Sequence, residues 1–110
     1  CCDIFSALKC IEFISKRDDV RLLIVDSVAA LASPLLGGHT NPMGHSLLTQ
    51  LSRALKAIAN RSLMPVVVSN AAVSSSGAAA LGRQWRAVPN VRVQLRQLVS
   101  TAVAELSDVE

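Results

Sequence analysis

The fold follows from residues 21–27, Arg-Leu-Leu-Ile-Val-Asp-Ser. Its four consecutive aliphatic residues have the length of a strand, and because they do not alternate with polar residues we expect both faces to be covered. We therefore predict a central strand of a parallel sheet. Asp26 would lie at the carboxyl edge of the sheet, where open α/β sheets bind ligands, and could hold magnesium directly or through water. The alternative is an Asp that only caps the next loop.

A second apolar strand is predicted at residues 65–70, Pro-Val-Val-Val-Ser-Asn, with the proline at its first residue, where a missing N–H is tolerated. Residues 45–61 carry leucines and an isoleucine at spacings of three and four, which predicts an amphipathic helix. A strand, a loop, a helix and a strand in this order form a βαβ unit with parallel strands. The predicted fold class is α/β, a parallel sheet flanked by helices.

A helix is also predicted at residues 3–16, because apolar side chains recur along one side and Asp3 can cap the first turn. Residues 37–44 combine three glycines with proline and asparagine, so we expect a loop there. His39 and His45 border the second half of this loop. Two histidines without a third ligand make a weak metal site, and exposed loop side chains are the simpler interpretation.

The segments after the second strand are predicted from composition and periodicity. Residues 71–80 are mostly Ala and Ser, which predicts a loop on the same edge of the sheet as Asp26. Trp85 is the only tryptophan, and we expect it to pack on the core rather than to stack on a base. Residues 90–96 alternate apolar and polar side chains, which indicates a half-exposed edge strand. A short helix is predicted from residue 97 to 110.

Charge is distributed unevenly along the chain. The formal net charge is +3, but no acidic residue lies between Asp26 and Glu105, whereas seven basic residues do. This basic half could attract nucleic acid, or it could face an acidic protein partner or solvent. If it contacts DNA directly, we expect binding to fall steeply between low and physiological salt.

The three cysteines, Cys1, Cys2 and Cys10, all lie at the start of the chain. Their odd number argues against a disulfide framework, and the absence of a nearby histidine argues against zinc, so idle thiols in a reducing compartment are the simpler interpretation. No apolar run reaches the roughly 18 residues of a membrane span, and no signal-peptide pattern is recognisable. We therefore expect no membrane partner.

Residues 22–31, Leu-Leu-Ile-Val-Asp-Ser-Val-Ala-Ala-Leu, resemble the second nucleotide motif of the RecA-like strand-exchange recombinases. Residues 33–38, Ser-Pro-Leu-Leu-Gly-Gly, resemble the family's first DNA loop as it stands in the D paralogues of the eukaryotic recombinase. The helix and strand at 51–70 end in Ser-Asn, as is typical of the family. Residues 80–85, Ala-Leu-Gly-Arg-Gln-Trp, resemble its Ala-Leu-Gly-Arg-x-Trp and are the most specific match. The resemblance covers roughly residues 3–95.

This resemblance implies a partial RecA-like P-loop NTPase core at residues 1–96, followed by a divergent helical tail at 97–110. It implies ATP and magnesium as cofactors. The residues implied at the nucleotide are Asp26, Ser27 and Asn70, with Asp26 also at the magnesium ion through water.

The resemblance also implies DNA, single-stranded or branched, as a partner in the nucleus, together with other recombinase paralogue subunits. Loops 33–45 and 71–80 would lie towards DNA or a neighbouring subunit. The residues implied at DNA are Gly37, Gly38, His39 and Arg83.

Several departures from the family's pattern limit this prediction. The glycine-rich phosphate loop with its lysine, which makes most phosphate contacts, is absent, and so is the catalytic glutamate. Ala71 stands where the family usually has Gln or His. Although the family consists of DNA-dependent ATPases, we expect this chain alone neither to hydrolyse ATP nor to bind it tightly. The predicted function is part of a DNA-repair recombinase paralogue acting in homologous recombination. The alternative is a truncated, non-catalytic interaction module of a paralogue complex.

Overall fold

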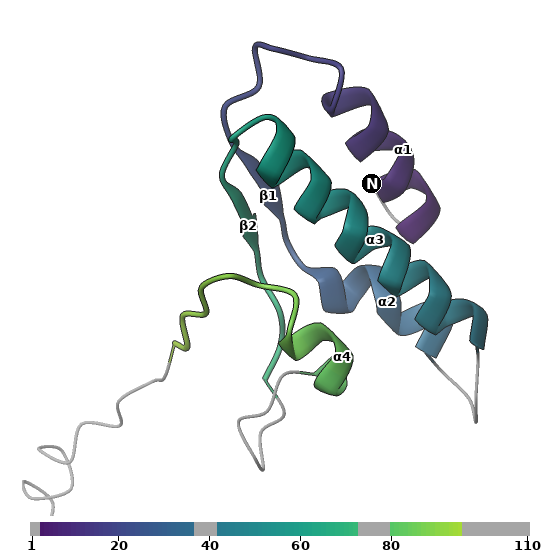
Figure 1. Cartoon of the computed structure of the whole chain (residues 1–110). Helices are drawn as coiled ribbons and strands as arrows, with labels where there is room; N and C mark the ends of the chain where they lie inside the picture. Colours follow the sequence, from purple (N-terminus) through teal and green to yellow (C-terminus); the bar gives the residue numbers. More distant parts are fainter. Residues whose placement is uncertain (1–2, 37–41, 73–79, 96–110) are drawn as a thin grey trace, which may run out of the picture.

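The computed structural model describes residues 3–36, 42–72 and 80–95, which form a small α/β unit (Figure 1). The two strands pair in parallel, with Leu23 opposite Val66 and Val25 opposite Val68. The predicted parallel sheet with flanking helices is thereby confirmed. The elements in chain order are α1 (Ile4–Ile14), β1 (Leu23–Val25), α2 (Val28–Leu36), α3 (Pro42–Arg61), β2 (Val66–Val68) and α4 (Gly82–Arg86).

Helix α1 begins at the predicted cap. The Asp3 carboxylate accepts hydrogen bonds from the Ser6 backbone N–H at 2.8 Å and from the Ser6 hydroxyl at 3.0 Å. Both hydrogen bonds lower the pKa of Asp3 from its ordinary value of 3.8, and the bond from the backbone N–H has the larger effect. The stabilisation that the cap gives is therefore complete above that value, and it is lost as the pH falls through the lowered pKa.

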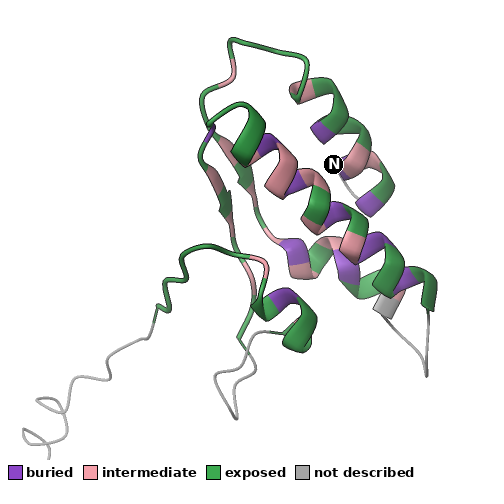
Figure 2. Cartoon of the chain, in the orientation of Figure 1, coloured by how far each residue is buried: buried purple, intermediate pink, exposed green. Residues whose placement is uncertain are grey.

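Helix α3 is the centre of the core. It packs against α1, α2 and β2, and Figure 2 shows buried positions recurring along its length. The leucine stripe predicted from the sequence is therefore confirmed. The helix begins at Pro42 rather than at His45, since proline is well tolerated at a first helical position. Its buried apolar residues are Leu47, Leu48, Leu51, Leu55 and Ile58.

The expectation that both faces of the sheet are covered is wrong for the described residues. Leu23, Val25 and their partners on β2 pack against the core. Ile24 and Val67, which are register partners and share the other face, are 61% and 52% exposed. The described helices pack on one face of the sheet only. The other face stays exposed to solvent although its residues are aliphatic.

The prediction of a loop from residue 33 onward is wrong at residues 33–36, which belong to α2. Pro34 lies inside this helix and has no N–H to donate to the carbonyl of Ala30. The Ser33 hydroxyl donates to that carbonyl instead, at 3.4 Å. This side-chain bond compensates in part for the missing backbone bond, which lets the helix continue past the proline.

Gly44 marks the close approach of α3 to α2. A Cβ at this position would lie 2.6 Å from the Leu35 carbonyl oxygen, a backbone atom that cannot move aside on its own. Alanine usually stabilises a helix relative to glycine, but here we expect Gly44→Ala to destabilise the chain by about 1–3 kcal/mol because of overpacking. Thermal unfolding followed by circular dichroism measures the change. The exposed Ser46→Ala serves as a control, and a Gly44→Ala chain as stable as that control would contradict the steric argument.

Of the predictions for the segment after β2, one is confirmed and another is wrong. Trp85, on α4, is 4% exposed and belongs to the core, as predicted. The edge strand predicted at 90–96 is absent from the described part, 90–95, where Val93 is 79% exposed. An alternating sequence forms a strand only beside a partner, and in the described sheet β1 and β2 pair only with each other. The tail predicted at 97–110 lies outside the described residues.

None of the described helices is long and apolar enough to cross a membrane.

Candidate functional site

The candidate site is the carboxyl edge of the sheet, where the first polar residues after β1 and β2 meet. Because Val25 is paired with Val68, the residues that follow them, Asp26 and Ser69, lie side by side at the end of the sheet. The Ser69 hydroxyl donates a hydrogen bond to Asp26 Oδ1. The Ser69 backbone N–H donates to the carbonyl of Val25 at 3.0 Å, so the strand pairing itself positions the two side chains.

Ser69 was not among the residues singled out from the sequence. The signal that could have found it is the common length of the two apolar runs, since parallel strands in register place the residues that follow them side by side. Its hydroxyl fixes one carboxylate oxygen of Asp26, and no described residue forms a hydrogen bond with the other oxygen.

Ser27 has a structural role in addition to its predicted role at the nucleotide. Its Oγ accepts a hydrogen bond from the Ala30 backbone N–H at 3.2 Å, in the manner of a helix cap for α2. The backbone N–H of Val28, the first residue of α2, donates to the Ser69 carbonyl at 3.1 Å. The start of α2 is thus tied to both strands, which holds the turn at Asp26 and Ser27 against the sheet edge.

Asn70 follows Ser69 and carries an unusual amide. Both its Oδ1 and its Nδ2 are buried and have no hydrogen-bond partner among the described residues. Buried polar atoms are nearly always paired, and leaving one unpaired costs about 1–3 kcal/mol. The described residues therefore leave the polar atoms of this amide without an explained partner.

The donor set at this edge fits a magnesium ion in part. The carboxylate of Asp26 and the hydroxyls of Ser27 and Ser69 are hard oxygen ligands of the kind that magnesium prefers, whereas the amide oxygen of Asn70 is buried. Magnesium usually keeps several waters and takes further oxygens from phosphates. In the part of the chain that the structure describes, no three His, Cys, Asp or Glu side chains gather as metal ligands. The ion would therefore be held by Asp26 together with water and the phosphates of a nucleotide.

Of the four residues predicted at DNA, the structure describes only Arg83. Gly37, Gly38 and His39 lie outside the described residues. Arg83 is exposed on α4, and this helix is attached to α3 by a hydrogen bond of 2.7 Å from Gln84 Nε2 to Thr49 Oγ1. Within 3–36, 42–72 and 80–95, no ion pair joins Arg83 to an acidic residue.

No protein-family model matches the chain. Over 85 residues it is 38% identical to DNA repair protein RAD51 homolog 4 of Bos taurus, a match that covers 74% of this chain and 26% of that protein. Over 80 residues it is 41% identical to DNA repair protein RAD51 homolog 4 of Mus musculus, which covers 69% of this chain and 24% of that protein. The chain thus spans about a quarter of the length of these relatives. The family predicted from the sequence is confirmed: the chain is a partial RecA-like recombinase sequence, similar to RAD51 homolog 4.

Proposed function

We propose that the chain is part of a DNA-repair paralogue of the recombinases that acts in homologous recombination in the nucleus, together with DNA and other paralogue subunits. The observation that carries this proposal is the 38% and 41% identity to proteins named for DNA repair. In this proposal residues 1–96 are the later part of a RecA-like core and residues 97–110 a divergent tail.

Within that core, the carboxyl edge of the sheet contributes to a site for magnesium and ATP. The bound ion would neutralise phosphate charge. Asp26 holds the ion through water, Ser69 fixes the orientation of the Asp26 carboxylate, and Asn70 binds a further polar group. The phosphate loop that makes most nucleotide contacts is not among these residues, so in this proposal another part of the same protein supplies it.

Asp26→Asn tests this role. Measured by calorimetry on the chain in complex with a recombinase paralogue subunit, the affinity for magnesium ATP is expected to fall about 10- to 100-fold, as is typical when a group that holds a metal through an outer shell is lost. Asp19→Asn is the matched control, because Asp19 is an exposed carboxylate paired with Arg17 at 2.5 Å and is not at the sheet edge. Equal affinities of the two variants would contradict the proposed role of Asp26.

The second candidate function is a non-catalytic interaction module of a paralogue complex. The open face of the sheet favours it, since Ile24 and Val67 are exposed aliphatic residues of a kind that a protein partner can cover. The same complex distinguishes the two functions. If the chain captures the paralogue subunit equally well with and without magnesium ATP, and Asp26→Asn leaves capture unchanged, the interaction module is supported and the nucleotide role is not.

A further inference from the structure

A groove of about 490 Å³ lies between α3 and the residues that follow α4. Arg53, Lys56 and Arg61 line it from α3, and Val88 lies on the opposite side. Lys56 Nζ donates to Asn90 Oδ1 at 3.3 Å, which links the helix to the segment after α4. The groove is thus built from two parts of the chain that are more than thirty residues apart in sequence.

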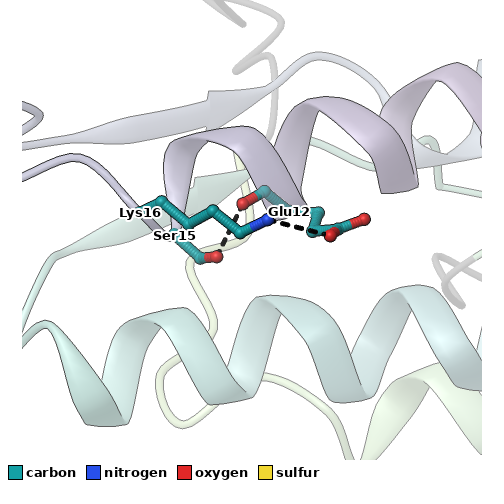
Figure 3. Close-up of polar contacts among 3 residues, drawn as sticks. All are labelled: Glu12, Ser15 and Lys16. Atoms are coloured by element: carbon teal, nitrogen blue, oxygen red, sulfur yellow. Dashed lines mark hydrogen bonds and ion pairs between the residues drawn. The ribbon is translucent and has the colours of Figure 1, made fainter.

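Among the residues that the structure describes, the cations of this groove form no ion pair with an acidic side chain. None of its lining residues is acidic, and in the described ranges ion pairs form only near the end of α1 and the turn after it, Lys16 with Glu12 and Arg17 with Asp19. Arg61 also lines a second cavity together with Glu12. However, Glu12 is already paired with Lys16 at 3.1 Å, as Figure 3 shows, so it does not neutralise the groove.

The other polar groups of the groove match the chemistry of phosphate. Arg53, Lys56 and Asn60 recur at spacings of three and four, so they lie along one side of α3. Ser52 also lines the groove, but its hydroxyl already donates to the Thr49 carbonyl at 2.8 Å. Phosphate groups in protein–nucleic acid complexes are bound by donors of the remaining kinds, guanidinium, ammonium and amide.

The remaining lining residues favour a nucleic acid over an acidic protein as the ligand. They also favour contact with the sugar–phosphate backbone over recognition of the bases. The apolar lining residues are the small residues Ala57, Ala87 and Val88, which form no deep pocket for the large anchoring side chains of a protein interface. No aromatic residue lines the groove, and the nearby Trp85 is buried in the core. Base stacking, which requires an exposed aromatic face, is therefore unsupported.

We propose that this groove binds the sugar–phosphate backbone of a nucleic acid strand independently of base sequence. The inference rests on the proposed function for the presence of DNA as a partner, but it assigns the contact to α3 and the segment after α4 rather than to the loop at 37–39. The affinity it provides is electrostatic, so it depends steeply on salt.

The test measures binding of the full chain to a fluorescein-labelled, mixed-sequence single-stranded oligonucleotide by fluorescence anisotropy at low salt. The groove variant is Arg53→Glu with Lys56→Glu. The control is Lys9→Glu with Arg21→Glu, which removes the same charge at exposed positions that line neither cavity. We expect the groove variant to lose at least about tenfold in affinity and the control less than about threefold. Both variants change the net charge equally, but only the groove variant removes side chains that would contact phosphate directly. Equal losses would overturn the assignment to the groove.

The neutral pair Arg53→Gln with Lys56→Gln gives a second readout. Since each phosphate contact on a single strand contributes about 0.7 to the salt slope, the slope of log affinity against log salt should become shallower by about 1.4. An unchanged slope would overturn the proposal. Thermal unfolding of each variant verifies that the fold is kept, as expected for side chains outside the core.

The outcomes also separate this proposal from the proposed function. If the unmodified chain binds no DNA at low salt, the groove and the DNA contact of the proposed function both fail, whereas the Asp26 test is unaffected. If it binds DNA but the groove variant behaves like the control, only the groove fails. If polyglutamate binds the groove more tightly than the oligonucleotide, the nucleic acid assignment is overturned in favour of an acidic protein.

Discussion

Replacing Leu51 with alanine is expected to lower the free energy of unfolding by about 2–5 kcal/mol, as is typical for removing a buried leucine side chain. Leu51 is fully buried and lies on α3, the helix that contacts α1, α2 and β2. A cavity at this position would weaken the packing of α3 against all three of these elements. Because small domains have a total stability of only about 5–15 kcal/mol, this single change would remove a large part of it. Urea unfolding followed by circular dichroism measures the loss.

The matched control is Leu63→Ala, which makes the same chemical change at a side chain that is 87% exposed. We expect this control to change the free energy of unfolding by less than about 0.5 kcal/mol. Similar losses for the two variants would mean that α3 is not the centre of the core.

Replacing Trp85 with alanine is expected to cost about 3–5 kcal/mol, since removing a large buried aromatic forfeits both transfer energy and packing. Helix α4 has only five residues, from Gly82 to Arg86, and so short a helix is not stable in water on its own. Trp85 is its only buried residue. We therefore expect the loss to begin as detachment of α4 from α3.

Hydrogen exchange distinguishes detachment from global unfolding. In the Trp85→Ala chain, the amides of residues 82–88 should exchange faster than those of α3, whereas Trp85→Phe should keep much of the protection. Because Val88 lies on one side of the basic groove, the alanine variant should also weaken binding of the labelled oligonucleotide. Uniform acceleration across α3 and α4 would contradict the role of Trp85 as a local anchor.

Much of this architecture could be predicted because short-range patterns determine it. The aliphatic runs that precede Asp26 and Ser69 specify two strands, and the leucine spacing of α3 specifies its inner face. The Asp3 cap of α1 also follows from local chemistry. The candidate site could be located at the sheet edge for the same reason, since the polar residue after each apolar run is visible in the sequence.

The features that the sequence missed depend on side-chain bonding and on long-range packing. Helix α2 continues through Pro34, and the Ser33 hydroxyl bonds the carbonyl that proline leaves unpaired, whereas the family resemblance implied a loop from residue 33. The alternating segment at 90–95 has the pattern of a strand but no strand beside it. The open face at Ile24 reflects which of the described helices pack on the sheet, a property that strand composition does not encode.

The most direct test of the central claim, that these residues are part of a recombinase paralogue with a nucleotide site at Asp26, is to sequence the natural transcript upstream of the codon for Cys1. We expect an in-frame phosphate loop of the form G-x-x-x-x-G-K followed by Ser or Thr, which would supply the phosphate contacts that the edge at Asp26 requires. A start codon close to Cys1 with no such motif in frame would contradict the nucleotide site and leave an interaction module as the function of the chain.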